Sequence, residues 1–192
     1  MSTNARSRST DQRFYGVAEA IVTDNDDPEN EGRVKVRFPW FDGDMVSEWC
    51  RVRQPYAGPG YGWYLVPEVG DEVLVAFIHG DMRLPVILGG LWNGQDKPST
   101  ARGGGRDPKL LRTKKGHEIL LDDSDGAEKI VIVDSSGKNR VEIDAASNSI
   151  TVESQDGKLI LRGREVEIEA QQGIKVTAGA TMDLTGSTIN LN

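Results

Sequence analysis

The sequence predicts an all-β protein in two parts, a small barrel followed by a repetitive, strand-rich prism. All four Trp, four Tyr and four Phe fall between residues 14 and 92. Because aromatic side chains bury large areas, a conventional core is expected there. From residue 117 onwards, apolar residues instead recur as pairs separated by short polar segments. Members of a pair lie two residues apart, and such residues share one face of a strand.

Composition limits the possible function classes. The 192 residues carry a net charge of −7, which argues against non-specific nucleic-acid binding, because that needs positive surface. The single cysteine, Cys50, excludes an internal disulfide and a cysteine-based zinc site. The longest apolar run, residues 73–78, is far shorter than the ~20 residues of a membrane span. Residues 1–6 lack the apolar stretch of a secretory signal, so synthesis in the cytoplasm is expected.

Residues 1–13 are predicted to form a flexible tail, because Ser, Thr, Asn and Arg dominate them. The next part, residues 14–95, contains five short β-like runs between Gly and Pro residues. The runs span residues 14–22, 33–38, 48–53, 72–78 and 86–88. Five short strands within about 80 residues predict a small antiparallel barrel, for which the OB-fold is the leading candidate.

Residues 96–112 are predicted to be a linker. The composition breaks at residues 93–94, and the segments 103–105 and 107–108 are too rich in Gly and Pro to hold a strand or a helix for long. We therefore expect the second domain to span residues 113–192.

Nine apolar pairs define this second domain. The first members of successive pairs lie 11, 11, 9, 9, 7, 8, 8 and 7 residues apart, so the sequence is an internal repeat that contracts. The paired residues, which are predicted to form the core, are Ile119, Leu121, Ile130, Ile132, Val141, Ile143, Ile150, Val152, Leu159, Leu161, Val166, Ile168, Ile174, Val176, Met182, Leu184, Ile189 and Leu191.

A repeat of about eight residues is too short to bury its own apolar pair. It extends over at most about 26 Å, whereas coils made from one chain usually need roughly 20 or more residues to enclose a core. Three copies would supply three sides, close a triangular prism and remove most free strand edges. The sequence therefore predicts a trimeric prism. The alternative is a flat meander, which would need neither near-identical pairs nor a shrinking repeat.

An ordered set of short motifs runs through residues 14–192. Its members are Phe14-Tyr15-Gly16-Val17, Asp27-Pro28, Glu31-Gly32-Arg33-Val34-Lys35-Val36, Phe38-Pro39-Trp40, Trp49-Cys50-Arg51-Val52, Ala57-Gly58 with Gly60 and Gly62, Val66-Pro67, Gly70-Asp71-Glu72-Val73-Leu74-Val75-Ala76-Phe77, Gly80-Asp81, Pro85, Gly89, Asn93-Gly94 and Thr113-Lys114-Lys115-Gly116-His117-Glu118-Ile119. Together they resemble the spike proteins of contractile injection machines, among them phage baseplate assembly protein V and the VgrG proteins of type VI secretion. The resemblance implies an OB-fold followed by an intertwined trimeric β-helix.

The resemblance also implies a mechanical role in a phage tail or phage-tail-like particle, without enzymatic activity. The homotrimer is expected to join a hub at the baseplate, and the hub is expected to be a separate protein because few residues precede the predicted barrel. Effector cargo is a further expected partner, and the target membrane is expected to be contacted only mechanically. A PAAR-type tip protein is expected on the C-terminal end, at Thr188, Ile189, Asn190, Leu191 and Asn192.

Three patterns with catalytic potential have simpler interpretations. His79 and His117 lie in different domains and have no Ser or Cys partner by motif. The carboxylate pairs at 26–27 and 122–123 could suggest a glycosidase, but their turn-like contexts favour solvated loops. The glycines at 103–105 lack the Lys-Ser/Thr and the flanking helix of a phosphate loop. No catalytic residue, metal ligand or cofactor is therefore expected.

Single-stranded nucleic-acid binding is the alternative function. OB-folds often bind single strands, and basic residues alternate along two of the predicted strands. These residues are Arg33, Lys35, Arg37, Arg51 and Arg53. Against this alternative stand the net acidity and the absence of any such role for the repeat. The basic side chains are instead expected to bond acidic neighbours on adjacent strands or on the hub.

Overall fold

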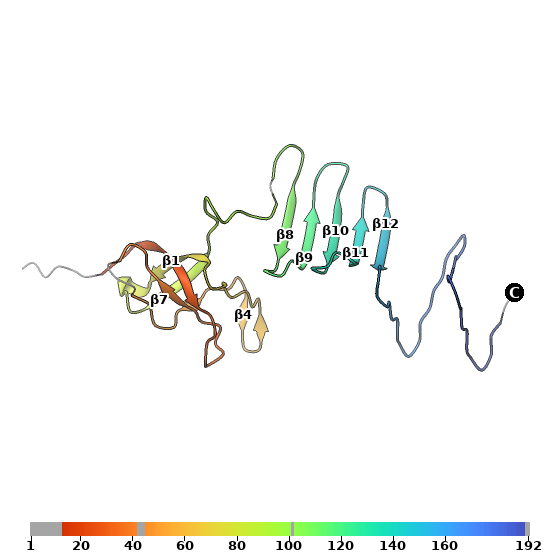
Figure 1. Cartoon of the computed structure of the whole chain (residues 1–192), viewed down its shortest axis with the longest axis horizontal. Coiled ribbons are helices and arrows are strands. Elements are labelled where there is room, and N and C mark those ends of the chain that lie inside the picture. Colours follow the sequence, from red (N-terminus) through yellow and green to blue (C-terminus); the bar gives the residue numbers. More distant parts are fainter. Residues whose placement is uncertain (1–12, 42–44, 101, 191–192) are drawn as a thin grey trace, which may run out of the picture. The chain divides into compact units, whose positions relative to one another are not determined.

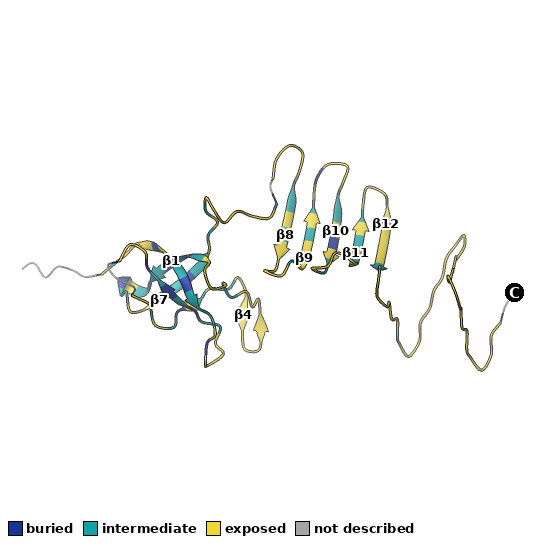
Figure 2. Cartoon of the chain, viewed as in Figure 1, coloured by how far each residue is buried: buried dark blue, intermediate teal, exposed yellow. Residues whose placement is uncertain are grey.

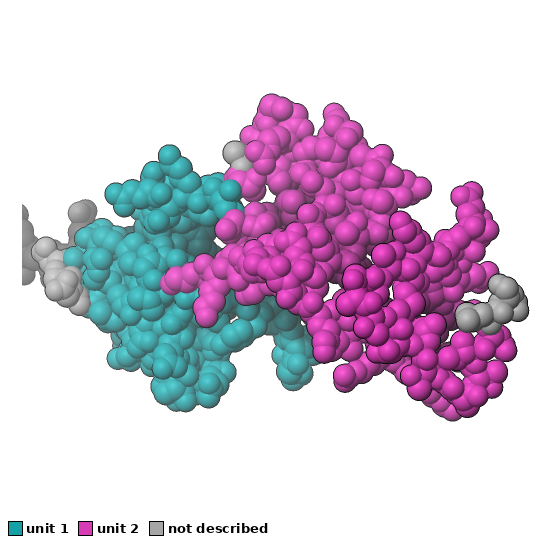
Figure 3. Space-filling view, turned by 45° about the vertical axis from the view of Figure 1, so that its right-hand side comes forward, with its two compact units in different colours: residues 1–99 teal, residues 100–192 magenta. Residues whose placement is uncertain are grey.

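The computed structural model describes residues 13–41, 45–100 and 102–190 of the chain. The predicted tail lies outside these residues, apart from Arg13. The described chain is all-β, as predicted, and its one helical element is the 3-10 turn η1 (Ile78–Gly80). It forms two compact units, residues 1–99 and 100–192 (Figure 1, Figure 3).

Five strands of the first unit form the barrel. They are β1 (Val17–Asp24), β2 (Lys35–Arg37), β3 (Arg51–Val52), β6 (Glu72–Phe77) and β7 (Pro85–Gly90). Each of the five predicted runs overlaps one of these strands. Their order is β2-β1-β6-β7-β3, and an antiparallel bridge between Val34 and Cys50 joins the two ends.

One pairing differs from the expected antiparallel barrel, because β3 and β7 run parallel. The other pairings along the sheet, β2 with β1, β1 with β6 and β6 with β7, are antiparallel. A closed ring of five strands cannot alternate its direction throughout. One pair of neighbours therefore has to be parallel.

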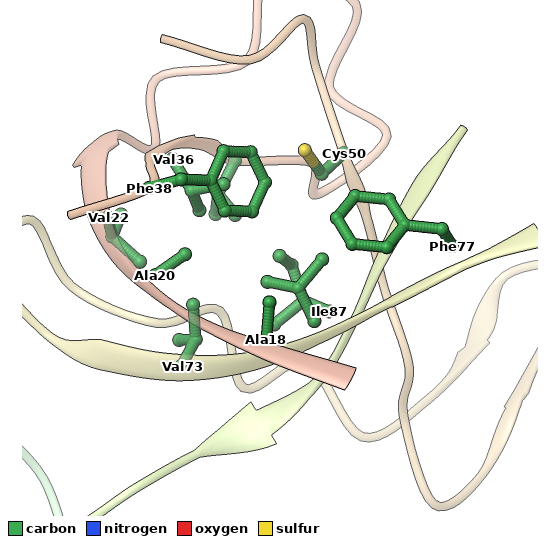
Figure 4. Close-up of a cluster of buried hydrophobic side chains, with 11 residues drawn as sticks. Ala18, Ala20, Val22, Val36, Phe38, Cys50, Val73, Phe77 and Ile87 are labelled. Carbon is green, nitrogen blue, oxygen red and sulfur yellow. The ribbon is translucent and has the colours of Figure 1, made fainter. Parts of the chain in front are cut away.

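Every second side chain of the barrel strands points into the barrel and fills its interior. Ala18, Ala20 and Val22 are buried on β1, and every second residue of β6 is buried, as expected when side chains alternate between the two faces of a strand. The buried cluster, drawn in Figure 4, contains Ala18, Ala20, Val22, Val34, Val36, Phe38, Cys50, Val73, Val75, Phe77 and Ile87. The first unit therefore buries an apolar core within a single chain.

The core lies between residues 14 and 92, as expected, but most aromatic residues of this region lie outside it. Only Phe38 and Phe77 among them belong to the buried cluster. Tyr56, Tyr61 and Trp63 are more than half exposed. They lie on or beside a small hairpin of β4 (Ala57–Gly58) and β5 (Tyr61–Gly62), which no predicted run covers. The interior of a small barrel is filled by a few side chains, here mostly Ala and Val, so it has little room for rings.

The connection from β1 to β2 is held by Asp27. This buried carboxylate accepts hydrogen bonds from the backbone N–H groups of Glu29, Glu31 and Arg33. The Arg33 guanidinium donates to both carboxylate oxygens, at 3.0 and 2.8 Å. These donors, and the guanidinium above all, hold the pKa of the Asp27 carboxyl well below its ordinary value. The prediction of a solvated loop is therefore wrong for Asp27, which anchors a structural turn.

Five antiparallel strands of the second unit form one sheet. They are β8 (Pro108–Arg112), β9 (Glu118–Asp122), β10 (Lys129–Val133), β11 (Asn139–Asp144) and β12 (Ser149–Ser154). Their order, β12-β11-β10-β9-β8, pairs each strand with its neighbours in the sequence (Figure 1). Residues 108–112 fall in the segment predicted as a linker, but here they form a strand. The search for apolar pairs missed this strand, because the position two residues before Leu111 is held by the charged Lys109.

Beyond Ser154 the fold changes, because no strand occurs among residues 155–190. The first four apolar pairs lie in β9–β12, which have the meander topology that was the alternative to the prism. The first three steps between pairs, of 11, 11 and 9 residues, connect strands of one sheet. The 9-residue step from Ile150 to Leu159 and the later steps of 7 or 8 residues lead to pairs that belong to no strand. The repeat therefore makes hairpins within one chain only in its first part.

Candidate functional site: an apolar sheet face

The candidate functional site is one face of the β8–β12 sheet, on which side chains stack in two rows. The strand register places opposite one another the residues of row A, which are Leu111, Ile119, Ile132, Val141 and Val152. Row B contains Lys109, Leu121, Ile130, Ile143 and Ile150. On each strand the members of the two rows are two residues apart, so both rows lie on the same side of the sheet.

This face is open to solvent in the single chain (Figure 2). Ile132 is 51% exposed in row A, and Ile150 is 72% exposed at the end of row B. Monomeric soluble proteins rarely expose contiguous apolar patches of more than a few hundred Å². The two rows therefore have the apolar composition of a protein core, but their side chains remain exposed in the described chain.

The opposite face of the same sheet is covered by its own charged side chains. Val131 is buried there, between strands that carry two ion pairs on the same face. Arg112 pairs with Glu118 at 2.5 Å, and Arg140 pairs with Glu142. The aliphatic stems of such side chains cover apolar surface while their charged ends stay in water. This face is therefore the solvent side of the sheet.

Row B begins with a charge. The Lys109 Nζ atom lies 2.9 Å from Asp107 Oδ1 and 2.5 Å from Asp123 Oδ2. The two carboxylates, Asp123 first, raise the pKa of Lys109. Leu111 extends row A by one strand. The sequence analysis missed both Lys109 and Leu111. Their two-residue spacing, which is the same as in the later pairs, was the signal that could have found them.

A groove runs along row A at one end of the sheet. Leu111, Ile119, Ile132, Val141 and Val152 line it, and so do Lys158 and Leu159 from the segment that follows β12. The chain therefore turns towards the apolar face as it leaves the sheet.

The structure brings eight of the predicted core residues together in rows A and B. The others lie among residues 155–190 or beyond. Those that are described are between 47% and 69% exposed, and they are Leu159, Leu161, Val166, Ile168, Ile174, Val176, Met182, Leu184 and Ile189. Of the predicted tip-docking residues, Thr188, Ile189 and Asn190 are exposed and belong to no strand. Leu191 and Asn192 lie outside the described residues.

A turn carboxylate fixes the register of β10 and β11. The Asp134 carboxylate accepts hydrogen bonds from Asn139 Nδ2 and from Ser136 Oγ, both at 2.8 Å. These neutral donors, Asn139 first, lower the pKa of Asp134 to about 2. The turn thereby aligns Ile132 with Val141 in row A.

The two histidines have structural surroundings. The His117 Nδ1 atom accepts a hydrogen bond from the Ser135 backbone N–H at 3.2 Å. His79 lies in η1 with a φ of 52°. Among the residues that the structure describes, no group of three or more His, Cys, Asp or Glu side chains could hold a metal ion. The described part of the chain contains no helix with the length and apolar composition of a membrane span.

Two of the five basic residues considered for nucleic-acid binding have partners within the barrel unit. Arg33 pairs with Asp27, Glu29 and Glu31 at 2.8, 3.0 and 3.3 Å. The Lys35 Nζ atom lies 4.9 Å from the centre of the Trp49 ring, in reach of a cation–π interaction. Arg33 thus bonds acidic residues, but they lie in the preceding loop and not, as had been expected, on an adjacent strand.

Comparison with known proteins connects this fold to injection machines. Residues 18–92 match the family described as the type VI secretion system/phage-baseplate injector OB domain. This match covers the barrel strands, and the OB-type assignment made from the sequence is confirmed.

Three curated relatives extend the similarity. The type VI secretion system spike protein VgrG3 of Vibrio cholerae serotype O1 is 35% identical over 113 residues, which are 54% of this chain and 11% of the relative. The spike protein VgrG1a of Pseudomonas aeruginosa is 35% identical over 131 residues, 60% of this chain and 20% of the relative. The actin cross-linking toxin VgrG1 of Vibrio cholerae serotype O1 is 27% identical over 164 residues, 83% of this chain and 14% of the relative. The chain thus spans at most a fifth of these relatives.

Proposed function

We propose that this VgrG-like chain, with its injector OB domain at residues 18–92, is the structural central spike of a contractile injection particle. Such a particle is a phage tail, a phage-tail-like bacteriocin or a type VI-like system. Three copies form the spike, which pierces the target envelope when the sheath contracts. The role is mechanical and uses no catalytic residue. In support, two of the relatives are named spike proteins.

The single observation that carries this proposal is the exposed face formed by rows A and B. Nine of its ten residues are Ile, Leu or Val. Each such side chain gains about 1.5–3 kcal/mol when it is fully buried, and the single chain leaves much of that gain unused. Three copies of one sheet face, each turned inwards, enclose a triangular core. A homotrimer would therefore bury the apolar side chains of rows A and B without any other protein.

Residues 155–190 support the same arrangement. Their apolar pairs keep the two-residue period of a strand but form no strand within the chain. Unpaired backbone groups and exposed apolar side chains are both costly in a rigid structure. Three intertwined copies pair the backbones and bury the side chains together, which makes a stiff prism.

The proposed partners rest on the resemblance to spike proteins. They are a hub protein of the baseplate, a PAAR-type tip protein at Thr188–Asn192, and effector cargo. The spike itself is made in the cytoplasm and becomes part of the particle. Each of these points is a proposal that a purified particle can test.

The test compares two neighbouring substitutions on β12 in particles from the native host. Val152→Asp puts a carboxylate into row A, whereas Thr151→Asp puts one on the opposite, solvent side of the same strand. Electron microscopy of the particles is expected to show a central spike with Thr151→Asp and none with Val152→Asp, because three carboxylates in a dry core block assembly. Normal spikes with Val152→Asp would contradict the proposal.

A further inference from the structure

We infer that the β8–β12 sheet folds first within one chain, and that its free β12 edge then receives residues 155–168 of a second copy. This inference rests on the proposed trimer and adds to it an order of assembly and a starting surface. It is carried by the two edges of the sheet, by the direction of the β12 backbone groups and by the path of the chain after β12.

The two edges of the sheet differ in their capacity to accept another strand. The β8 edge carries Pro108, Lys109 and Arg112. Proline and basic residues are the usual means by which natural sheets block pairing at an edge. The β12 edge reads Ser-Ile-Thr-Val-Glu-Ser and contains no Pro, Lys or Arg. New strands can therefore add at β12 but not at β8.

The hydrogen-bond pattern shows which β12 groups are available. The Gln155 N–H donates to the Lys138 carbonyl at 3.0 Å, and the register of β11 with β12 continues without a shift. In an antiparallel pair the bonded positions alternate. The N–H groups of Ile150, Val152 and Ser154 therefore point away from β11, where an added strand would meet them.

The chain does not place its own next segment on this edge. Lys158 and Leu159 line the groove along row A, so the segment after β12 crosses towards the apolar face. The edge is thus left for another chain.

A second copy of this chain fits the edge because its sequence continues the rows. Val152 ends row A and Ile150 ends row B, and they are 52% and 72% exposed. Leu159 and Leu161 form the next apolar pair, with the same two-residue period. A neighbour's strand that carries this pair extends both rows by one step. Later pairs repeat the step towards the C-terminal end.

The test is refolding of the full chain from denaturant at several chain concentrations, followed by pulsed hydrogen exchange and mass spectrometry. Protection in β9–β11 is expected to appear at a rate that does not depend on concentration, because those strands pair within one chain. Protection in residues 155–168 is expected later, at a rate that rises with concentration, because it needs a second copy. One shared, concentration-dependent rate for both segments would overturn the inference.

Failure of the proposed trimer is distinguishable from failure of this inference. The native mass of the refolded product reports whether three chains associate at all. The order of protection is then judged only on material that has reached the trimer. A trimer in which both segments gain protection together retains the proposed function and refutes the order of assembly.

Two proline variants test the edge itself. Val152→Pro removes an N–H that points away from the sheet at β12. Leu110→Pro removes one that points away at β8, because the Thr113 N–H donates to the His117 carbonyl and the β8–β9 register runs without a shift. Val152→Pro is expected to slow protection of residues 155–168 roughly tenfold, and Leu110→Pro to leave it unchanged. Protection in β9–β11 confirms in the same spectra that each sheet has folded. Equal rates for the two variants would refute a role for the β12 edge.

Discussion

In the barrel, Val34 and Val75 have no exposed surface, whereas in the second unit Ile132 and Ile150 are 51% and 72% exposed. In both units the degree of burial alternates from one residue to the next along the strands. The difference lies in closure. A bridge between Val34 and Cys50 joins the ends of the barrel sheet, whereas the sheet of the second unit ends at β8 and β12. The same strand pattern therefore makes a core in one unit and an interface in the other.

The largest expected difference between the two units follows from substitutions that put a charge into each apolar region. Val75→Asp buries an unpaired carboxylate, which costs several kcal/mol against a total stability of about 5–15 kcal/mol. We expect it to unfold the barrel. Ile132→Asp is expected to leave the barrel folded and to block association only. Near-ultraviolet circular dichroism measures the difference, because all Trp and Tyr residues lie in residues 14–92. Loss of that signal in Ile132→Asp would show that the units are not independent.

Thermal unfolding at several chain concentrations is the next contrast. The barrel core is complete within one chain, so its melting temperature is expected to stay constant. The second unit is expected to melt at higher temperature when the chain is more concentrated, because association stabilises the folded state by mass action. Hydrogen exchange during heating reports the two units separately. A concentration-independent transition for β9–β12 would show that the sheet is stable without partners.

The Asp27 anchor offers a test within the barrel. Asp27→Asn leaves the Arg33 guanidinium beside a neutral amide and keeps only one of the two oxygens that accept the three backbone N–H bonds. The barrel is expected to melt at a distinctly lower temperature, while association of the second unit is unchanged. Asp26→Asn is the matched control, since Asp26 is the adjacent carboxylate and only Asp27 accepts these bonds. Equal melting temperatures for the two variants would show that the anchor contributes nothing.

The smallest expected effect concerns two carboxylates with similar pKa values and different causes. Asp81 of the barrel has its pKa lowered to about 2 chiefly by Arg83, at 2.6 Å, whereas Asp134 reaches about 2 through neutral donors. Both stabilise their units fully above pH 4 or so, and this contribution is lost as the pH falls towards 2. At about 1 M salt the Debye length is only ~3 Å. NMR titration is expected to show a larger salt-induced rise in the pKa of Asp81 than in that of Asp134, and an equal rise would contradict the assigned causes.

The sequence predicted where the strands lie better than how they pair with one another. Pairs such as Ile119 and Leu121 identified β9–β12 and the face that holds the rows, because strand alternation is a local property. The resemblance to spike proteins is confirmed by the injector OB domain and by the VgrG relatives. Residues 108–112 were missed because Lys109 occupies one of the two positions that are apolar in the later pairs, although the segment pairs with β9 like them. The parallel β3–β7 pair was missed because it depends on the closure of a ring of five strands. The buried Asp27 was missed because its carboxylate is enclosed by a turn of residues 29–33, which the sequence pattern did not predict.

The central claim is that two other copies of this chain cover rows A and B. The most direct measurement is the native mass of the purified full-length chain from nanomolar to micromolar concentration. The account predicts a species with the mass of three 21.0 kDa chains, which Thr151→Asp retains and Val152→Asp loses. A stable monomer at micromolar concentration, with β9–β12 protected from hydrogen exchange, would contradict it.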